Sequence, residues 1–287
     1  MKKNILIIGF GNIGYRHLQS IINNININKI YIYDIKKSAY DKIKNNLKSR
    51  SKLIFIKNIN KLKNNFFYLA IIAGYAFERF KIINKINNKF KIKYYLIEKI
   101  VENNLINLDK LKSMKINAFV NLPMRLMTPF KIIKRNIEPL KKIDCEYIGT
   151  RWNLASNSLH YINYVSYLTN SNIKRIKIKK ISKPYKTKRR KIIDFYGEIK
   201  ILYDNGSTLM LKSQKKNIER LFNIRQGKKM LKYFIDKNIL IFNKKKLDIK
   251  REEISKLTNI FFNALKNGKY ILPSIEDHFL ENKLFHY

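Results

Sequence analysis

Residues 9–14 of the chain read Gly9-Phe10-Gly11-Asn12-Ile13-Gly14, which is the pattern G-x-G-x-x-G. The pattern directly follows the apolar run Ile5–Ile8 and opens a stretch with helical spacing, which is the context that a dinucleotide-binding turn requires. Gly9 permits the tight turn, Gly11 leaves bare backbone for a pyrophosphate, and Gly14 lets the helix pack closely on the strand. The amino end of the helix then directs free amides and partial positive charge at the phosphates. The alternative is a glycine-rich turn without a ligand.

An acidic residue follows at the spacing that this motif requires. Asp34 lies 20 residues after Gly14, at the end of the second apolar run. A carboxylate there can accept hydrogen bonds from the adenosine ribose hydroxyls, which favours NAD over NADP. Lys36 and Lys37 are close enough to weaken that preference, so NADP stays possible.

The first 120 residues alternate short apolar runs with amphipathic segments. The apolar runs are Ile5–Ile8, Ile30–Tyr33, Leu53–Ile56, Phe67–Ala73, Tyr94–Ile97 and Ile116–Val120. Between most of them, apolar residues recur at helical spacing while Lys and Asn fill the other face. This alternation predicts an α/β fold in which residues 1–120 form a doubly wound Rossmann domain with a parallel sheet.

The pattern changes after residue 120. Helical segments are expected near Phe130–Ile137 and over Asn157–Leu168, and period-two alternation begins at Ile173. Asp204-Asn205-Gly206 predicts a hairpin turn, and Ser274 followed by two acids predicts a helix start. Residues 121–287 are therefore expected to form an α+β domain with a mostly antiparallel open sheet.

The formal net charge of +41 suggests a nucleic-acid partner, but the composition offers another explanation. The chain has 49 Lys, 49 Ile and 35 Asn, together 133 of 287 residues, against 12 Arg and 7 Ala. Lys, Ile and Asn share A/T-rich codons, whereas a selected nucleic-acid surface would enrich Arg. We therefore prefer to explain the charge by drift of the genome toward A and T, and we do not expect nucleic acid to be the partner.

The same question arises for the segment Lys174–Lys191, which has 11 basic residues and no acid. It is the best candidate for a surface that binds nucleic acid or anionic lipid. Isoleucines alternate through it as in an amphipathic strand, so a solvated strand face followed by a loop is the preferred interpretation. An anionic nucleotide sugar or polysaccharide precursor is the other partner that the segment could bind.

Cysteine content and hydropathy indicate a cytoplasmic location. The single Cys145 excludes an internal disulfide and a multi-cysteine zinc site, and no metal site is expected. The apolar run near the start is interrupted by glycines, so no signal peptide is expected. No stretch of about 18 uncharged apolar residues exists either, so we expect no membrane span.

The motifs, in their order and spacing, resemble the Gfo/Idh/MocA oxidoreductase family over nearly the whole chain. The similar segments are Gly9–Leu18, Glu98-Lys99-Ile100, Asn121–Arg125, Gly149–His160 and Leu272–Asp277. The segment Gly149–His160 resembles a subgroup from surface-polysaccharide gene clusters. The resemblance implies hydride transfer between a nicotinamide cofactor and a sugar or nucleotide-sugar hydroxyl or ketone. It also implies a homo-oligomer that forms through the C-terminal sheet.

The resemblance assigns site residues as well. Lys99 follows an apolar run at the carboxyl end of a predicted parallel strand, where it could move the proton of a sugar hydroxyl. His160 is the second acid/base candidate, with Asn157 one helical turn before it. Glu98 and Ala73 are expected beside the cofactor. A surface lysine and a packing histidine are the ordinary alternatives for Lys99 and His160.

Three further residues are candidates for binding the substrate. Arg125 and Arg151 are notable because Arg is scarce in this chain, and a retained Arg suggests a bidentate contact to a carboxylate or phosphate. Trp152, the one Trp, could stack on a sugar face, although a core aromatic is the default.

Three departures from the family pattern leave a second interpretation open. Ile100 replaces the Pro that the family usually has at this position. Ala73-Gly74-Tyr75 lies where many members have a Thr-Pro or Asn-Pro pair beside the cofactor. Asn157 and Asn163 lie where related enzymes often have Asp. A catalytically inactive dinucleotide-binding regulatory or interaction protein of the same fold is therefore the alternative to an enzyme.

Overall fold

The computed structural model describes residues 1–36, 50–186 and 193–283. The chain divides into two compact units, one formed by Met1–Leu122 with Glu253–Tyr287 and the other by Pro123–Glu252. The first boundary lies two residues beyond the expected one at residue 120. Residues 253–287, expected in the second domain, group with the first unit instead.

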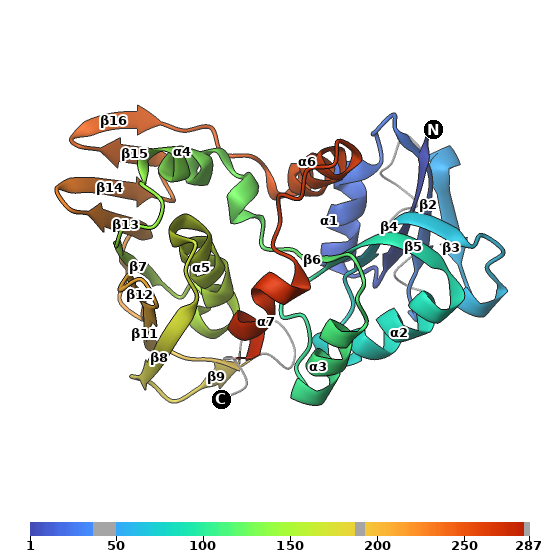
Figure 1. The fold of residues 1–287 in the computed structure, drawn as a ribbon, viewed down its shortest axis with the longest axis horizontal. Coiled ribbons are helices and arrows are strands. Elements are labelled where there is room, and N and C mark those ends of the chain that lie inside the picture. Colours follow the sequence, from blue (N-terminus) through green and yellow to red (C-terminus); the bar gives the residue numbers. More distant parts are fainter. Residues whose placement is uncertain (37–49, 187–192, 284–287) are drawn as a thin grey trace. The chain divides into compact units, whose positions relative to one another are not determined.

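A six-stranded parallel sheet forms the centre of the first unit (Figure 1). Its strand order is β3-β2-β1-β4-β5-β6, the doubly wound order that the sequence predicts. The strands are β1 (Lys3–Ile8), β2 (Ile27–Tyr33), β3 (Leu53–Ile56), β4 (Phe66–Ile72), β5 (Lys91–Ile97) and β6 (Ala118–Val120). The strand order reverses between β1 and β4, and in such sheets ligands bind at the carboxyl ends of the strands beside that point.

Helices pack on this sheet and bury its apolar strands. They are α1 (Asn12–Ile21), α2 (Arg79–Lys89), α3 (Leu105–Ser113), α6 (Ile254–Lys266) and α7 (Ile275–Lys283), with short 3-10 helices η3 (Arg50–Lys52), η4 (Ile59–Lys61) and η5 (Ala76–Glu78). Ile5 to Ile8 of β1 are at most 1% exposed, as expected for a strand covered on both faces.

The C-terminal helices complete the first unit. Helix α6 lies against α1 (Figure 1) and buries an apolar face of Leu257, Phe261, Phe262 and Leu265. Before α7, the main chain of Pro273 accepts a hydrogen bond from Val120 at the edge of the sheet. Ser274 and Asp277 cap each other's main-chain amides at 3.0 Å, so the predicted helix start is confirmed.

The second unit is built on an eight-stranded sheet in the order β16-β15-β14-β13-β7-β12-β11-β8. Strands β7 and β12 pair in parallel and the other neighbours pair antiparallel, which confirms the predicted sheet type. The strands are β7 (Asp144–Thr150), β8 (Ile173–Lys180), β11 (Gly197–Tyr203), β12 (Thr208–Gln214), β13 (Leu221–Gln226), β14 (Lys229–Phe234), β15 (Ile239–Phe242) and β16 (Lys245–Asp248).

The smaller elements of this unit are η6 (Pro123–Leu126), the helices α4 (Thr128–Asn136) and α5 (Leu154–Thr169), and a short pair of strands, β9 (Tyr185–Lys186) and β10 (Ile193–Asp194). The predicted hairpin joins β11 to β12, with Gly206 at a φ of +81°. Helix α5 packs on one face of the sheet (Figure 1), where Tyr147 stacks on Tyr161 at 4.0 Å between ring centroids.

The described residues include neither a membrane-spanning helix nor a cluster of metal-ligand side chains. No helix in these ranges is long and apolar enough to cross a membrane. Within the same ranges, no group of three or more His, Cys, Asp or Glu side chains could hold a metal ion. In the basic segment Lys174–Lys191, residues 187–191 lie outside the described part of the chain, and the rest includes β8, whose Lys side chains are exposed.

Candidate functional site

The glycine turn between β1 and α1 requires two of its glycines for steric reasons. Gly9 has a φ of +84°, and a Cβ atom there would lie 2.4 Å from the amide nitrogen of Gly74. A Cβ on Gly14 would lie 2.1 Å from the carbonyl oxygen of Gly9. The first glycine therefore allows β4 to approach the turn, and the third allows α1 to begin directly against it.

Gly11 differs, because a Cβ atom there would meet no protein atom within 4 Å. Gly11 is also the N-cap residue of α1; it has no side chain to cap the helix, and no acid lies in the first turn. The backbone at Gly11 thus faces open space at the amino end of a helix, as binding of a diphosphate requires. Of the other turn residues, Phe10 is fully buried, Ile13 is half-buried and Asn12 is exposed. The turn therefore fits the pyrophosphate of a dinucleotide.

Asp34 lies at the end of β2 and holds the same turn. One carboxylate oxygen, Oδ2, accepts a hydrogen bond from the amide of Phe10 at 2.5 Å, and Oδ1 accepts one from the amide of Lys36 at 2.7 Å. The carboxylate thus joins the end of β2 to the turn after β1. Lys37, the other predicted modifier of cofactor preference, lies outside the described residues.

The end of β4 borders this turn from the other side. The amide of Ala73 donates to the carbonyl of Ile8 at 2.8 Å, and Gly74 packs against Gly9. The main chain at Gly74 thus lies against the turn, in the space that the missing side chain of Gly9 leaves. The structure therefore gathers four predicted cofactor residues, Gly9, Phe10, Asp34 and Ala73, around the carboxyl ends of β1, β2 and β4.

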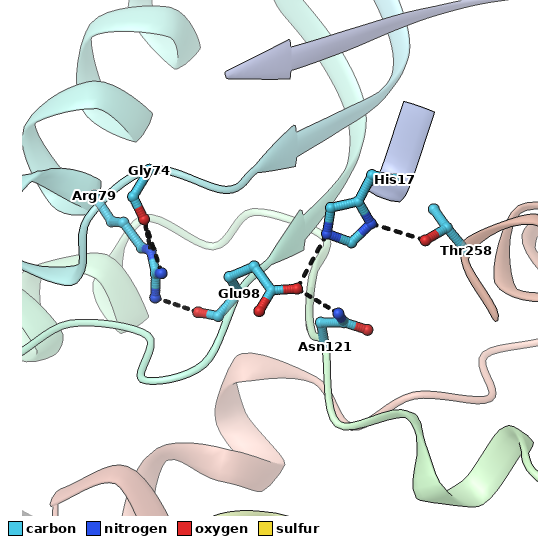
Figure 2. A network of polar contacts seen from close by, with 6 residues as sticks. All are labelled: His17, Gly74, Arg79, Glu98, Asn121 and Thr258. Carbon is cyan, nitrogen blue, oxygen red and sulfur yellow. Dashed lines mark hydrogen bonds and ion pairs between the residues drawn. The ribbon is translucent and has the colours of Figure 1, made fainter. Parts of the chain in front are cut away.

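Glu98 follows β5 and is the centre of a polar network (Figure 2). Its Oε1 atom lies 3.0 Å from Nε2 of His17 on α1, and it also accepts a hydrogen bond from the amide side chain of Asn121. The Nδ1 atom of His17 lies 2.8 Å from the hydroxyl of Thr258 on α6. The side chain of Glu98 thereby connects β5 to α1, to α6 and to the segment after β6.

The network sets the protonation state of Glu98. Burial alone would raise the pKa of this carboxyl, but the hydrogen bonds from His17 and Asn121 and the charge of Arg79 lower the pKa below its usual value. Glu98 is therefore ionised at neutral pH. Since its oxygen is already bonded to side chains of the same unit, the structure gives Glu98 a role in holding the strand end, in addition to its predicted place beside the cofactor.

Lys99 is half-buried and comes directly after Glu98, at the carboxyl end of β5. The Lys99–Ile100 peptide bond is cis. The main chain on either side of Lys99 is held by Arg79, whose guanidinium donates to the carbonyl oxygens of Glu98 and Ile100. The same guanidinium donates to the carbonyl of Gly74 from Nε at 3.1 Å and from Nη2 at 2.9 Å (Figure 2).

In the second unit, helix α5 carries the predicted acid/base residues. His160 is half-buried near the middle of the helix, and Asn163, one turn further, is 2% exposed. The side-chain amide of Asn157 donates to the carbonyl of Trp152 at 2.7 Å. This hydrogen bond connects the first turn of the helix to the residues that precede it. The structure therefore gives Asn157 a structural bond at the amino end of α5.

The three predicted substrate residues have different surroundings. Arg151 is exposed and precedes α5 with a φ of +45°. Arg125 lies in η6, with its guanidinium carbon 4.3 Å from the ring centroid of Tyr167. Trp152 is 6% exposed and donates from Nε1 to the carbonyl of Lys212 at 2.8 Å. The ring of Trp152 thus packs in the core of the unit, and its contact with a sugar stays a prediction.

Two residues of the first unit are not among the predicted site residues. His17 lies in the helix that follows the glycine turn, yet it bonds the residue before Lys99. Arg79 lies in an amphipathic stretch, whose pattern predicts a helix and no site residue. The scarcity of Arg drew attention to Arg125 and Arg151, and the same signal would have found Arg79.

Comparison with known proteins gives similarity in structure and none in sequence. The chain matches no family model and no curated protein sequence. UDP-N-acetylglucosamine 3-dehydrogenase GnnA from Acidithiobacillus ferrooxidans superimposes with a TM-score of 0.78 at 12% identity, over 99% of this chain and 96% of that chain. Scyllo-inositol dehydrogenase from Lactobacillus casei, solved with NAD(H) and scyllo-inositol, gives a TM-score of 0.71 at 12% identity over 99% and 95%.

A protein described as a transcriptional regulator has the same fold. Gal80p from Kluyveromyces lactis gives a TM-score of 0.73 at 13% identity, over 99% of this chain and 88% of that chain. The polysaccharide subgroup is not distinguished by these matches. Their coverage of nearly the whole chain confirms the predicted resemblance at the level of the fold: this chain has the fold of Gfo/Idh/MocA-type oxidoreductases.

Proposed function

We propose that this protein is an NAD-dependent oxidoreductase that acts on a sugar or nucleotide sugar. The observation that carries the proposal is the turn at Gly9–Gly14, where no acid lies in the first turn of α1 and the space beside Gly11 is open. Asp34 at the end of β2 would contact the adenosine ribose and favour NAD, while NADP stays possible. NAD(H) is present in the scyllo-inositol dehydrogenase neighbour.

Two side chains are proposed to handle protons in this reaction. When an alcohol is oxidised, the carbon-bound hydrogen leaves as a hydride to the bound nicotinamide and the hydroxyl proton passes to a base. We assign Nζ of Lys99 as that base, because Lys99 follows the carboxyl end of β5, the edge at which parallel sheets of this kind bind ligands. His160 on α5 is proposed as the second acid/base group, and Arg125 and Arg151 as binders of an anionic part of the substrate.

The substrate class follows from the resemblance and from the neighbours, one of which is a UDP-N-acetylglucosamine 3-dehydrogenase. A nucleotide sugar carries a diphosphate, which exposed Arg151 could bind through paired N–H groups. A role in surface-polysaccharide biosynthesis is consistent with this substrate class and is part of the proposal.

Thermal-shift titration tests the cofactor, and absorbance of the reduced nicotinamide tests turnover. Stabilisation by NAD(H) at micromolar concentration, followed by turnover of one member of a panel of nucleotide sugars and inositols, is the expected result. A protein that no dinucleotide stabilises would refute the proposal.

A non-catalytic dinucleotide-binding protein is the second candidate. Helix α5 carries Asn157 and Asn163 and has no acid in its sequence, and the regulator Gal80p shares the fold. Stabilisation by NAD(H) without turnover of any substrate in the panel would support this candidate.

Self-association through the sheet of the second unit is also proposed. The face that does not contact α5 carries half-buried apolar side chains on neighbouring strands, Ile148, Leu221, Phe234 and Ile239. Light scattering of the full chain and of Leu221→Lys tests this, because a charge in the middle of such an interface would shift the assembly toward the monomer.

A further inference from the structure

Arg79 is the first residue of α2, and its side chain turns into the unit to contact three main-chain carbonyls. Nε and Nη2 donate to Gly74, and Nη1 donates to Glu98 and to Ile100. The last two carbonyls lie on either side of Lys99. One guanidinium therefore holds the main chain immediately before and immediately after the proposed base.

The position of this guanidinium is specified by burial and by charge. Arg79 is 5% exposed, and burial lowers its pKa to about 10, against the opposing effects of Glu98 and Glu102. Glu102 is fully buried and accepts hydrogen bonds from the amides of Phe80, Asn103 and Asn104. Both acids are thus fixed by other groups, and they balance the charge of Arg79 while its N–H groups bind carbonyls.

The geometry requires Arg in particular. Its planar fork binds the carbonyl of Gly74 through Nε and Nη2 and the two carbonyls beside Lys99 through Nη1, whereas the ammonium of Lys is a single point that cannot reach both groups. The composition supports this requirement, because Lys outnumbers Arg by 49 to 12 in this chain and yet Arg occupies position 79.

The bond to Gly74 connects this clamp to the cofactor turn. Gly74 packs against Gly9, with its amide nitrogen 2.4 Å from where a Cβ of residue 9 would lie. Arg79 therefore joins the segment that borders the dinucleotide turn to the segment that carries Lys99. A displacement of about 1 Å at a reacting group can cost about a hundredfold in rate, so such a connection has a direct kinetic consequence.

We infer that Arg79 is a positioning residue, which fixes the main chain around Lys99 relative to the dinucleotide turn. The inference rests on the proposed function, since it assumes that Lys99 is the base. Arg79 itself takes no proton from the substrate in this scheme. Its effect is exerted through the carbonyls of Glu98 and Ile100.

The test compares Arg79→Lys with Arg135→Lys, a matched change at an exposed residue of α4. Competitive acylation of all lysines, quantified by peptide mass spectrometry, reports the reactivity of Lys99 without requiring turnover. We expect Lys99 in Arg79→Lys to react about threefold faster or more, because local opening exposes it, while the other lysines of the unit are unchanged. In wild type and Arg135→Lys, Lys99 should react alike.

Kinetics provide the second readout. In Arg79→Lys, kcat should fall about tenfold or more while the KM for the dinucleotide stays within about twofold, since the turn at Gly9–Gly14 is not altered. A purely structural role would instead lower dinucleotide affinity and thermal stability together. Unchanged Lys99 labelling in a folded Arg79→Lys protein would overturn the inference.

Arg79→Gln is the second variant, because its amide has a single nitrogen donor and cannot bind both Gly74 and the carbonyls beside Lys99. It should reproduce the faster labelling of Lys99. If both variants fail to fold, Arg79 is a core residue and the positioning role is refuted. If the wild type binds no dinucleotide, the proposed function fails, and the labelling comparison still decides whether Arg79 holds the segment of Lys99.

Discussion

The imidazole of His17 and the carboxylate of Glu98 lie 3.0 Å apart, although 81 residues separate them in the chain. His17 belongs to the helix that begins at the dinucleotide turn, and Glu98 precedes Lys99. A direct side-chain bond thus joins the part of the unit that is proposed to bind the cofactor to the part that carries the proposed base. The bond is buried, because the two side chains are 4% and 12% exposed.

Because of this pair, the free energy of unfolding should fall as the pH is lowered through the acid range. The pKa of Glu98 is lowered in the folded protein, so its ionisation stabilises the fold above the ordinary Glu pKa of about 4.3, and this contribution is lost as the pH falls through the lower folded value. The free energy of unfolding of Glu98→Gln should therefore be lower than that of the wild type by about 1–3 kcal/mol at neutral pH, and the difference should disappear in acid. Thermal unfolding of the two proteins at a series of pH values from neutral to acid measures this difference.

Asp109→Asn is the control, since Asp109 is exposed on α3. Its unfolding curve should follow that of the wild type at every pH. Parallel curves for wild type and Glu98→Gln would show that the carboxylate of Glu98 is not stabilised in the fold.

The first two glycines of the motif should respond differently to alanine. Gly11→Ala places its Cβ in open space, so we expect the unliganded protein to keep its stability to within about 0.5 kcal/mol while losing stabilisation by NAD(H). Gly9→Ala forces a contact with Gly74 at a positive φ and should destabilise the protein itself. Thermal shift with and without NAD(H) separates the two effects. Equal loss of ligand-free stability in both variants would contradict the open space at Gly11.

Asp34 should determine the cofactor preference. Asp34→Asn removes the charge that repels a 2′-phosphate but keeps an oxygen that can accept the bond from Phe10. We expect the ratio of NADP(H) to NAD(H) affinity to rise by about tenfold, because one charge interaction of about 1.4 kcal/mol is removed. Titration of the same variant with both cofactors gives the ratio. An unchanged ratio would place the ribose elsewhere.

Lys99 and His160 should affect turnover and leave cofactor binding intact. We expect Lys99→Gln to lower kcat by about 10²–10⁴-fold, the usual contribution of a positioned acid or base, and His160→Gln to lower it comparably. Dinucleotide affinity from thermal shift should match that of the wild type in both. Full activity of either variant on the best substrate would remove that residue from the proposed chemistry.

Asn157 should behave as a structural residue. Its side-chain amide donates to the carbonyl of Trp152 at 2.7 Å, so Asn157→Ala should lower the free energy of unfolding by about 1 kcal/mol. The value of kcat should change by less than about fivefold, far less than the loss at a catalytic acid or base. Urea unfolding and steady-state kinetics on the same preparation measure both. If kcat instead fell as much as in His160→Gln, Asn157 would have a catalytic role and the structural assignment would be wrong.

The sequence predicts those parts of the fold that depend on neighbouring residues. Strand β3 begins and ends where its apolar run does, and the glycine turn, the hairpin at Gly206 and the cap at Ser274 follow from local steric and hydrogen-bonding rules. Asp34 was also found, because a fixed spacing from Gly14 brings it to the turn. Local signals of this kind survive in a sequence dominated by Lys, Ile and Asn.

Long-range contacts could not be predicted in the same way. The parallel pairing of β7 with β12, the bond of His17 to Glu98 and the clamp of Arg79 all join segments that are distant in sequence. Trp152 shows the same limit, because its burial depends on rings from β7 and α5. Nothing in the pattern around these residues reports which distant group they meet.

The return of the C-terminal segment to the first unit has a consequence for synthesis on the ribosome. Residues 123–252 emerge as one uninterrupted stretch, and all the main-chain partners of their sheet are then available. The first unit begins before them, yet α6, which covers α1, and Pro273, which pairs with Val120, are translated after them. The first unit is thus completed only after the second has been made, and a nascent chain stalled before residue 253 lacks the helix that covers α1.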